Sequence, residues 1–174
     1  MHATKLALGL ALASLLSAGA AIADDMKSMA PTGPNPLVDH VKAVNSRFQD
    51  VAVAVSEGYS PIPCASGYDG GSMGVHYVNM DRMKDNVIDI SKPEAILYEP
   101  QAGGKLELVA VEYITFKGPA ALEGHLFNFD GAPNRYGLDP FYELHVWSWR
   151  DNPEGAFTDM NPNVSCNAMT ADGK

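Results

Sequence analysis

An apolar stripe with the period of an α-helix runs along residues 37–55. Its members recur every three or four positions and are Leu37, Val41, Val44, Phe48, Val51 and Val55. Such spacing puts the apolar side chains on one side of a helix. Asn35 before Pro36 suits a helix start, and Gly58 suits a helix end. The pattern predicts one amphipathic helix that packs on a sheet, with packing against a partner as the alternative.

Beyond this helix, the chain changes to short runs of β-branched, aliphatic and aromatic residues, separated by Gly, Pro, Asn and Asp. These runs predict strands over residues 75–80, 95–99, 106–116, 125–129 and 141–149. Gly103 and Gly104 mark a hairpin turn between the second and third of them. The expected class is α+β, with an N-terminal amphipathic helix packed on a curved, mostly antiparallel sheet of about five strands.

Residues 1–23 have the pattern of a signal peptide. Lys5 precedes a short apolar run, and the segment ends in a small-x-small motif at Ala23, after which we expect cleavage. The protein is then expected in the periplasm or outside the cell. Residues 24–36 are predicted to be a flexible linker, and residues 37–174 a single domain whose Pro- and Asn-rich C-terminal tail wraps around it.

The two cysteines, Cys64 and Cys166, are expected to form a disulfide bond, because an exported chain enters an oxidising compartment. A thiolate metal-ligand pair or a redox couple is the alternative, although no CxxC spacing supports it. The bond would connect the C-terminal tail to the segment that follows the first helix.

The charge balance limits the range of partners. The chain has 174 residues, with 12 Lys and Arg against 21 Asp and Glu, which gives a formal charge of −9. A nucleic-acid partner is not expected, because no excess of cations is present to replace phosphate counterions. We also expect no membrane span, because no apolar stretch approaches the required length. This balance leaves cations as the more natural partners, and the expected partner is a metal ion or a small molecule.

Polar residues inside the predicted strands are the candidates for chemistry. In a strand, every second residue lies on the same face. One face of the last predicted strand carries Phe141, Glu143, His145, Trp147 and Trp149. Tryptophans beside a glutamate and a histidine are typical of a pocket wall. Glu112 lies in the longest strand among apolar neighbours, where a carboxylate is costly unless it is paired or bound to a metal.

Three histidines on three different strands suggest a metal site. The predicted metal ligands are His76, His125, His145 and Glu143. Glu112, Trp147 and Trp149 are expected to line the same pocket as cofactor-binding or ligand-binding residues. Glu112 is also an alternative metal ligand, or a residue that orients a ring nitrogen. Imidazole and carboxylate together suit zinc, copper, iron or manganese.

Several alternatives stand beside this metal site. The same residues would also suit a metal-free pocket for a small ligand, or purely structural histidines. A copper site could use the methionines near His76, which are Met73, Met80 and Met83. The expected function is binding of a metal ion or small ligand, with a metal-dependent hydrolase or oxidoreductase and a structural or interaction module as alternatives. No residue is assigned as catalytic.

Five sequence blocks also carry a resemblance. They are GGSMGVHYVN (70–79), PEAILYEP (93–100), LVAVEY (108–113), LHVWSWRDNPEGAF (144–157) and NPNVSC (161–166). In these blocks the chain resembles a family of small exported bacterial proteins of uncharacterised function. The resemblance implies a domain over about residues 60–166, and it places His76, Glu94, Glu99, Glu112 and His145 inside motifs. It implies no activity.

Overall fold

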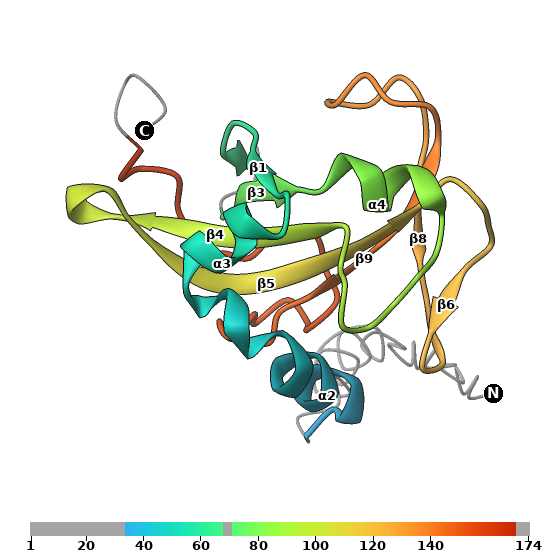
Figure 1. The fold of residues 1–174 in the computed structure, drawn as a ribbon, viewed down its shortest axis with the longest axis horizontal. Coiled ribbons are helices and arrows are strands. Elements are labelled where there is room, and N and C mark those ends of the chain that lie inside the picture. Colours follow the sequence, from blue (N-terminus) through green and yellow to red (C-terminus); the bar gives the residue numbers. More distant parts are fainter. Residues whose placement is uncertain (1–33, 68–70, 170–174) are drawn as a thin grey trace, which may run out of the picture. The chain divides into compact units, whose positions relative to one another are not determined.

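The structure is a computed structural model that describes residues 34–67 and 71–169. The predicted signal peptide and most of the predicted linker lie outside the described residues. Within the described residues, seven strands form one antiparallel sheet in the order β1-β3-β4-β5-β9-β8, and β2 also pairs with β3 (Figure 1). The expected α+β class with a mostly antiparallel sheet is confirmed.

The strands are β1 (Ser60–Pro61), β2 (Ala65–Ser66), β3 (Ser72–Val78), β4 (Ala95–Gln101), β5 (Lys105–Thr115), β8 (Asn128–Asp130) and β9 (Phe141–Val146). A separate two-stranded hairpin consists of β6 (Ala121–Leu122) and β7 (His125–Leu126). The helical elements are α2 (Pro36–Asn45), η1 (Ser46–Gln49), α3 (Val51–Ser56), α4 (Met80–Asp85) and η2 (Ala102–Gly104).

The helix expected over residues 37–55 is divided into α2, η1 and α3. Asn35 caps α2 by accepting hydrogen bonds from the amides of Leu37 and Val38. At the other end of α2, the buried Asn45 side chain donates to the carbonyls of Val41 and Ile90. Such side-chain bonds compete with the helical pattern. The tighter 3₁₀ turn that follows has fewer residues per turn, and it changes which side chains face the core.

This change of direction is visible in the burial of α3. Ala54 is 0% exposed, whereas Val55, a member of the predicted stripe, is 55% exposed. Asp50 adopts an extended conformation and starts α3 anew by accepting a hydrogen bond from the Ala52 amide. The stripe therefore predicted the first half of the helical region better than the second half.

The two faces of the sheet differ in character. One face packs against Leu37, Val41 and Phe48 from the helical elements, and its buried residues are Ile96, Tyr98, Val111, Tyr113, Leu144 and Val146 (Figure 1). The opposite face carries a second apolar cluster, which includes Ala95, Leu97, Ala110, Ile114, Phe141 and Trp147. Buried polar side chains accompany this second cluster.

The C-terminal segment returns to the beginning of β3. Asn161 and Ser72 exchange two backbone hydrogen bonds, both of 3.1 Å. Glu99 accepts a hydrogen bond from the Ser165 amide, and the predicted Cys64–Cys166 disulfide is present. The tail is therefore held at several points. Across residues 34–67 and 71–169, no helix has both the length and the apolar character needed to cross a membrane.

Glu94 provides a prediction about the pH dependence of stability. Its side chain is fully buried, and its Oε2 accepts a hydrogen bond from the Ile114 amide at 2.9 Å. Burial raises the pKa of Glu94 to about 8. Between the ordinary pKa of 4.5 and this value, the folded protein holds a proton that the unfolded chain has lost. The stability supplied by this proton is therefore complete at low pH and is lost as the pH rises toward 8.

We expect Glu94→Gln to become more stable relative to the wild type as the pH rises from 5 to 8, by about 3–4 kcal/mol. The uncharged amide keeps an oxygen for the Ile114 amide and has no proton to lose. Urea unfolding at several pH values measures the difference. Glu154→Gln, at an exposed carboxylate, is the matched control. A difference between Glu94→Gln and the wild type that does not change with pH would contradict the prediction.

Candidate metal centre

Three buried polar side chains meet on the second face of the sheet. His76 comes from β3, Glu112 from β5 and His145 from β9. Glu112 pairs directly with His145 across the β5–β9 ladder, and with Ala95 across the β4–β5 ladder. Because directly paired residues of neighbouring strands lie on the same face, the register alone places Glu112 beside His145.

A small residue on β4 lets His76 reach the other two. His76 pairs with Leu97, and the next residue of β4 on that face is Ala95, which lies beside Glu112. Strands two positions apart are separated by about 9–10 Å, so their long side chains can meet only above a short side chain. The alanine at position 95 leaves that space, and Nε2 of His76 lies 3.5 Å from Oε2 of Glu112.

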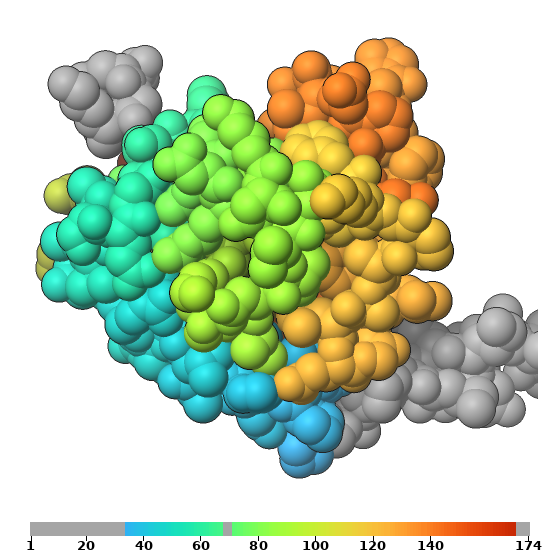
Figure 2. Space-filling model, turned by 45° about the vertical axis from the view of Figure 1, so that its right-hand side comes forward, coloured from blue at the N-terminus to red at the C-terminus, as the bar shows by residue number. Residues whose placement is uncertain are grey.

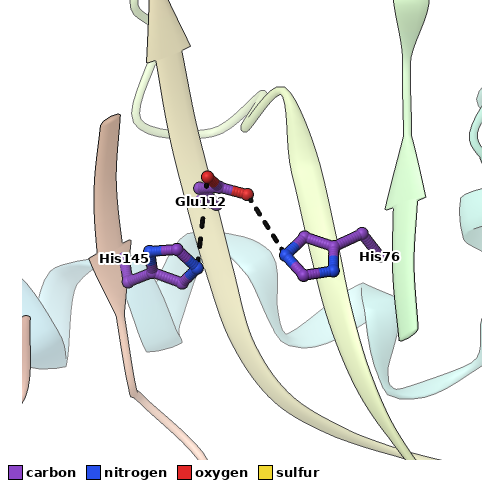
Figure 3. A group of neighbouring side chains, drawn as sticks. All are labelled: His76, Glu112 and His145. Carbon is purple, nitrogen blue, oxygen red and sulfur yellow. Dashed lines mark ion pairs between the residues drawn. The ribbon is translucent and has the colours of Figure 1, made fainter. Parts of the chain in front are cut away.

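The geometry of the three residues is compact (Figure 3). The Nε2 atom of His76 lies 3.5 Å from Oε2 of Glu112, and the Nε2 atom of His145 lies 4.0 Å from Oε1 of the same carboxyl group. One ligand atom from each residue lies within 4.8 Å of the others. The exposed fractions of His76, Glu112 and His145 are 2%, 3% and 0%. A cation placed between them could contact all three.

The ring nitrogens of this cluster lack the partners that buried polar atoms normally have. Among the described residues, neither nitrogen of His76 nor either nitrogen of His145 has a hydrogen-bond partner. Leaving a buried polar group unpartnered costs about 1–3 kcal/mol, and buried polar groups in native proteins are nearly always satisfied. A metal ion with nitrogen ligands at about 2.0–2.1 Å would satisfy one nitrogen of each ring.

The protonation states also suit cation binding. Burial lowers the pKa of His76 and of His145 to about 3, so both imidazoles are neutral near pH 7, as metal ligands must be. Burial raises the pKa of Glu112 well above its ordinary range, and the neighbouring Glu143 carboxyl raises it further. Burial also raises the pKa of Glu143. A bound cation would reverse this effect, because its positive charge stabilises the ionised carboxylates.

A cavity of about 360 Å³ adjoins His76 and Glu112. Most of its wall is apolar, with Val78, Ile114 and Phe141 from the sheet. In Figure 2, the orange region that includes residues 131–140 stands at the top of the molecule, and α4 belongs to the green region. Both regions contribute to the wall, through Met80, Met83, Tyr136 and Leu138. A small molecule in this cavity could approach an ion held by the cluster.

The other predicted site residues occupy different positions. Glu143 lies on β9, two residues before His145 on the same face, and it is 5% exposed. Trp147 stacks on His145, with ring centroids 6.2 Å apart and an angle of 15° between the rings. Its Nε1 donates a hydrogen bond to the Thr158 carbonyl at 2.6 Å. Trp147 therefore lies against one face of the His145 ring.

The structure does not bring His125 or Trp149 to this cluster. His125 belongs to the β6–β7 hairpin, where its Nε2 lies 3.4 Å from Asn35 and its ring lies 4.4 Å from that of Phe157. Trp149 packs with the helix-side core, because β9 ends at Val146 and the alternation expected up to residue 149 stops there. The strand predicted over residues 141–149 was therefore three residues too long.

Two residues near the cluster were not predicted from the sequence. Asp159 of the C-terminal tail has its Oδ1 3.6 Å from Nδ1 of His145. The ring of Tyr136 lies 6.2 Å from that of His76. Neither residue lies in a run with strand or helix periodicity, so its sequence context contains no signal that would place it at the site.

Comparisons with protein-family models, with curated proteins and with solved structures find no match to this chain. The geometry of the cluster is therefore the basis for the function proposed below.

Proposed function

We propose that this protein binds a transition-metal ion through His76, Glu112 and His145. The observation that carries the proposal is the set of buried imidazole nitrogens that have no partner within the described residues and face a shared carboxylate. Two neutral imidazoles and one carboxylate form a donor set found in zinc, copper, iron and manganese sites. Glu143 lies close enough to Glu112 to raise the pKa of its carboxyl.

The adjoining cavity supports a functional rather than a purely structural ion. Three protein ligands leave a coordination position open, as in catalytic sites, whereas structural sites are usually closed by four ligands. The cavity reaches the cluster on the side of His76 and Glu112. A metal-dependent hydrolase or oxidoreductase that acts on a small, partly apolar molecule is therefore the second candidate function.

We further propose that the protein works in the periplasm or outside the cell. The signal-peptide pattern of residues 1–23 supports export. The disulfide between Cys64 and Cys166 is consistent with an oxidising compartment, where such bonds persist.

Elemental analysis tests the metal proposal directly. We expect the protein purified from its native compartment to contain at least one equivalent of zinc, copper, iron or manganese per chain. After removal of the metal with a chelator, calorimetric titration with Zn²⁺ should restore binding. In His76→Gln, the affinity of this site should fall by about 100-fold or more, because a ligand is lost.

His125→Gln is the matched control, because it removes an imidazole that lies outside the cluster. This variant should bind Zn²⁺ as the wild type does, and circular dichroism should show that both variants are folded. A wild-type protein that holds none of the four metals, either as purified or after loading, would contradict the proposal and favour a metal-free ligand pocket. An equal loss of affinity in the two variants would also contradict it.

A further inference from the structure

His145 lies between two carboxylate groups rather than beside one. Its Nε2 faces Glu112 at 4.0 Å, and its Nδ1 faces Asp159 at 3.6 Å (Figure 3 shows the first of these). The side chain is 0% exposed, and neither nitrogen has a hydrogen-bond partner in residues 34–67 and 71–169. One ion at the first cluster would satisfy only Nε2, so the Nδ1 atom needs a separate explanation.

The second group consists of Glu143, Asp159 and the Nδ1 side of His145. One ligand atom from each of these residues lies within 4.8 Å of the others. Glu143 and His145 share a face of β9, whereas Asp159 comes from the tail. Asn152 fixes the tail there by donating hydrogen bonds to Thr158 Oγ1 and to the Met160 carbonyl, both at 2.9 Å.

Each group has its own cavity. The first cavity, of about 360 Å³, is lined by His76 and Glu112. A second cavity, of about 260 Å³, is lined by Glu143 and Asp159, and its wall is more polar, with Asn128 and Asp130. Arg135 and Tyr136 line both cavities. A cation could therefore reach Glu143 and Asp159 from a cavity that neither His76 nor Glu112 lines.

We propose that a second divalent cation binds to Glu143, Asp159 and Nδ1 of His145, so that the His145 ring bridges two ions. This inference rests on the proposed function, since it adds a second ion beside the first. With one nitrogen bound to each ion, the ring releases its remaining N–H proton to solvent. The imidazolate and the carboxylates of Glu112, Glu143 and Asp159 then carry four negative charges. These match the charge of two divalent ions, so the ions and their ligands together carry no net charge.

The stoichiometry of Zn²⁺ binding tests this inference. The protein as purified from its native compartment is stripped of metal with a chelator. It is then titrated with Zn²⁺ alone and desalted for elemental analysis. We expect two ions per chain in the wild type. Asp159→Asn and His76→Gln should each retain one ion, because each variant removes a ligand of a different site. His145→Gln should lose high affinity at both sites, because both use its ring.

A competing role for Asp159 gives a different result. A carboxylate next to the far nitrogen of a metal-bound histidine often only orients the ring. Its loss lowers the affinity of the site for the metal ion by about 10–100-fold. In that case the wild type would bind one ion, and Asp159→Asn would bind the same ion more weakly, which would overturn the second site but leave the proposed function standing. A wild type that binds no ion would overturn both. The wild-type stoichiometry needs no variant, so it decides the question even if a variant fails to fold.

Discussion

Replacing Cys64 and Cys166 by serine is expected to lower the free energy of unfolding by about 4–5 kcal/mol. The two cysteines are 102 residues apart in the sequence, so the disulfide closes most of the domain into one loop. In the chain-entropy account, such a loop removes many conformations from the unfolded chain, and the stabilisation grows with loop length. Folded domains are typically stable by only 5–15 kcal/mol, so the loss would be a large share of the total.

Urea unfolding of Cys64→Ser/Cys166→Ser and of the wild type measures this effect, with the wild type in reductant as the second comparison. Circular dichroism at low temperature serves as the control that the double variant still folds, since backbone hydrogen bonds between Ser72 and Asn161 also hold the tail. A loss below about 1 kcal/mol would contradict the prediction. It would mean that these non-covalent contacts already restrict the unfolded chain or that the oxidised fold is strained.

The pairing of side chains on one strand face could be predicted from the sequence, because alternation is a local property of the backbone. Glu143 and His145 share a face as expected, and Glu112 lies on the long strand among apolar neighbours. The prediction failed where the strand ended. Trp149 follows β9 after a turn, and its amide donates a hydrogen bond to the Val109 carbonyl, which directs the residue to the helix-side core.

The choice among the three predicted histidine ligands needed the strand order, which is not local. β3, β4, β5 and β9 are consecutive neighbours in the sheet, so His76 and His145 are within reach of Glu112. His125 lies in a separate two-stranded hairpin, although its sequence has the same Glu-x-His pattern as the strand of His145. The sequence pattern contains no information about which strands pair.

Asp159 shows a different limit of sequence reasoning. It lies in a segment without helical or strand periodicity, and its position depends on side-chain bonds from Asn152 and on the bridge between Asn161 and Ser72. Contacts of this kind depend on the complete fold. The disulfide was easier to predict, because two cysteines in a chain expected to enter an oxidising compartment offer a single pairing.

Glu112→Gln is expected to reduce the stabilisation of the protein by a metal ion without reducing the stability of the metal-free protein. Burial and the Glu143 carboxyl raise the pKa of Glu112 well above its ordinary range, so the fold without a bound ion favours the uncharged acid over the carboxylate. Glutamine has nearly the same shape and is also uncharged. The metal-free variant should therefore be at least as stable as the wild type near pH 7, because on folding the wild type must hold a proton at Glu112 that the unfolded chain has lost, whereas glutamine needs none.

The response to Zn²⁺ should differ sharply between the two proteins. An ion present at about 1,000 times its dissociation constant stabilises the folded state by about 4 kcal/mol, provided that it does not bind the unfolded chain. For a domain of this size, the melting temperature of the wild type should then rise by about 8–16 °C. Glu112→Gln offers a neutral amide oxygen in place of a carboxylate, so at the same Zn²⁺ concentration its melting temperature should rise clearly less than that of the wild type.

Thermal unfolding with Zn²⁺ and with chelator measures both quantities, and Glu154→Gln is the control for loss of a carboxylate at an exposed position. A variant that is strongly destabilised without metal and still gains the full wild-type rise would show that the Glu112 carboxyl supports the fold and is not a ligand. The expected pattern, undiminished stability without metal and a reduced response to it, would have the opposite meaning. It would show that the sheet tolerates this buried polar cluster without needing its charge, and that the carboxylate acts in holding a cation.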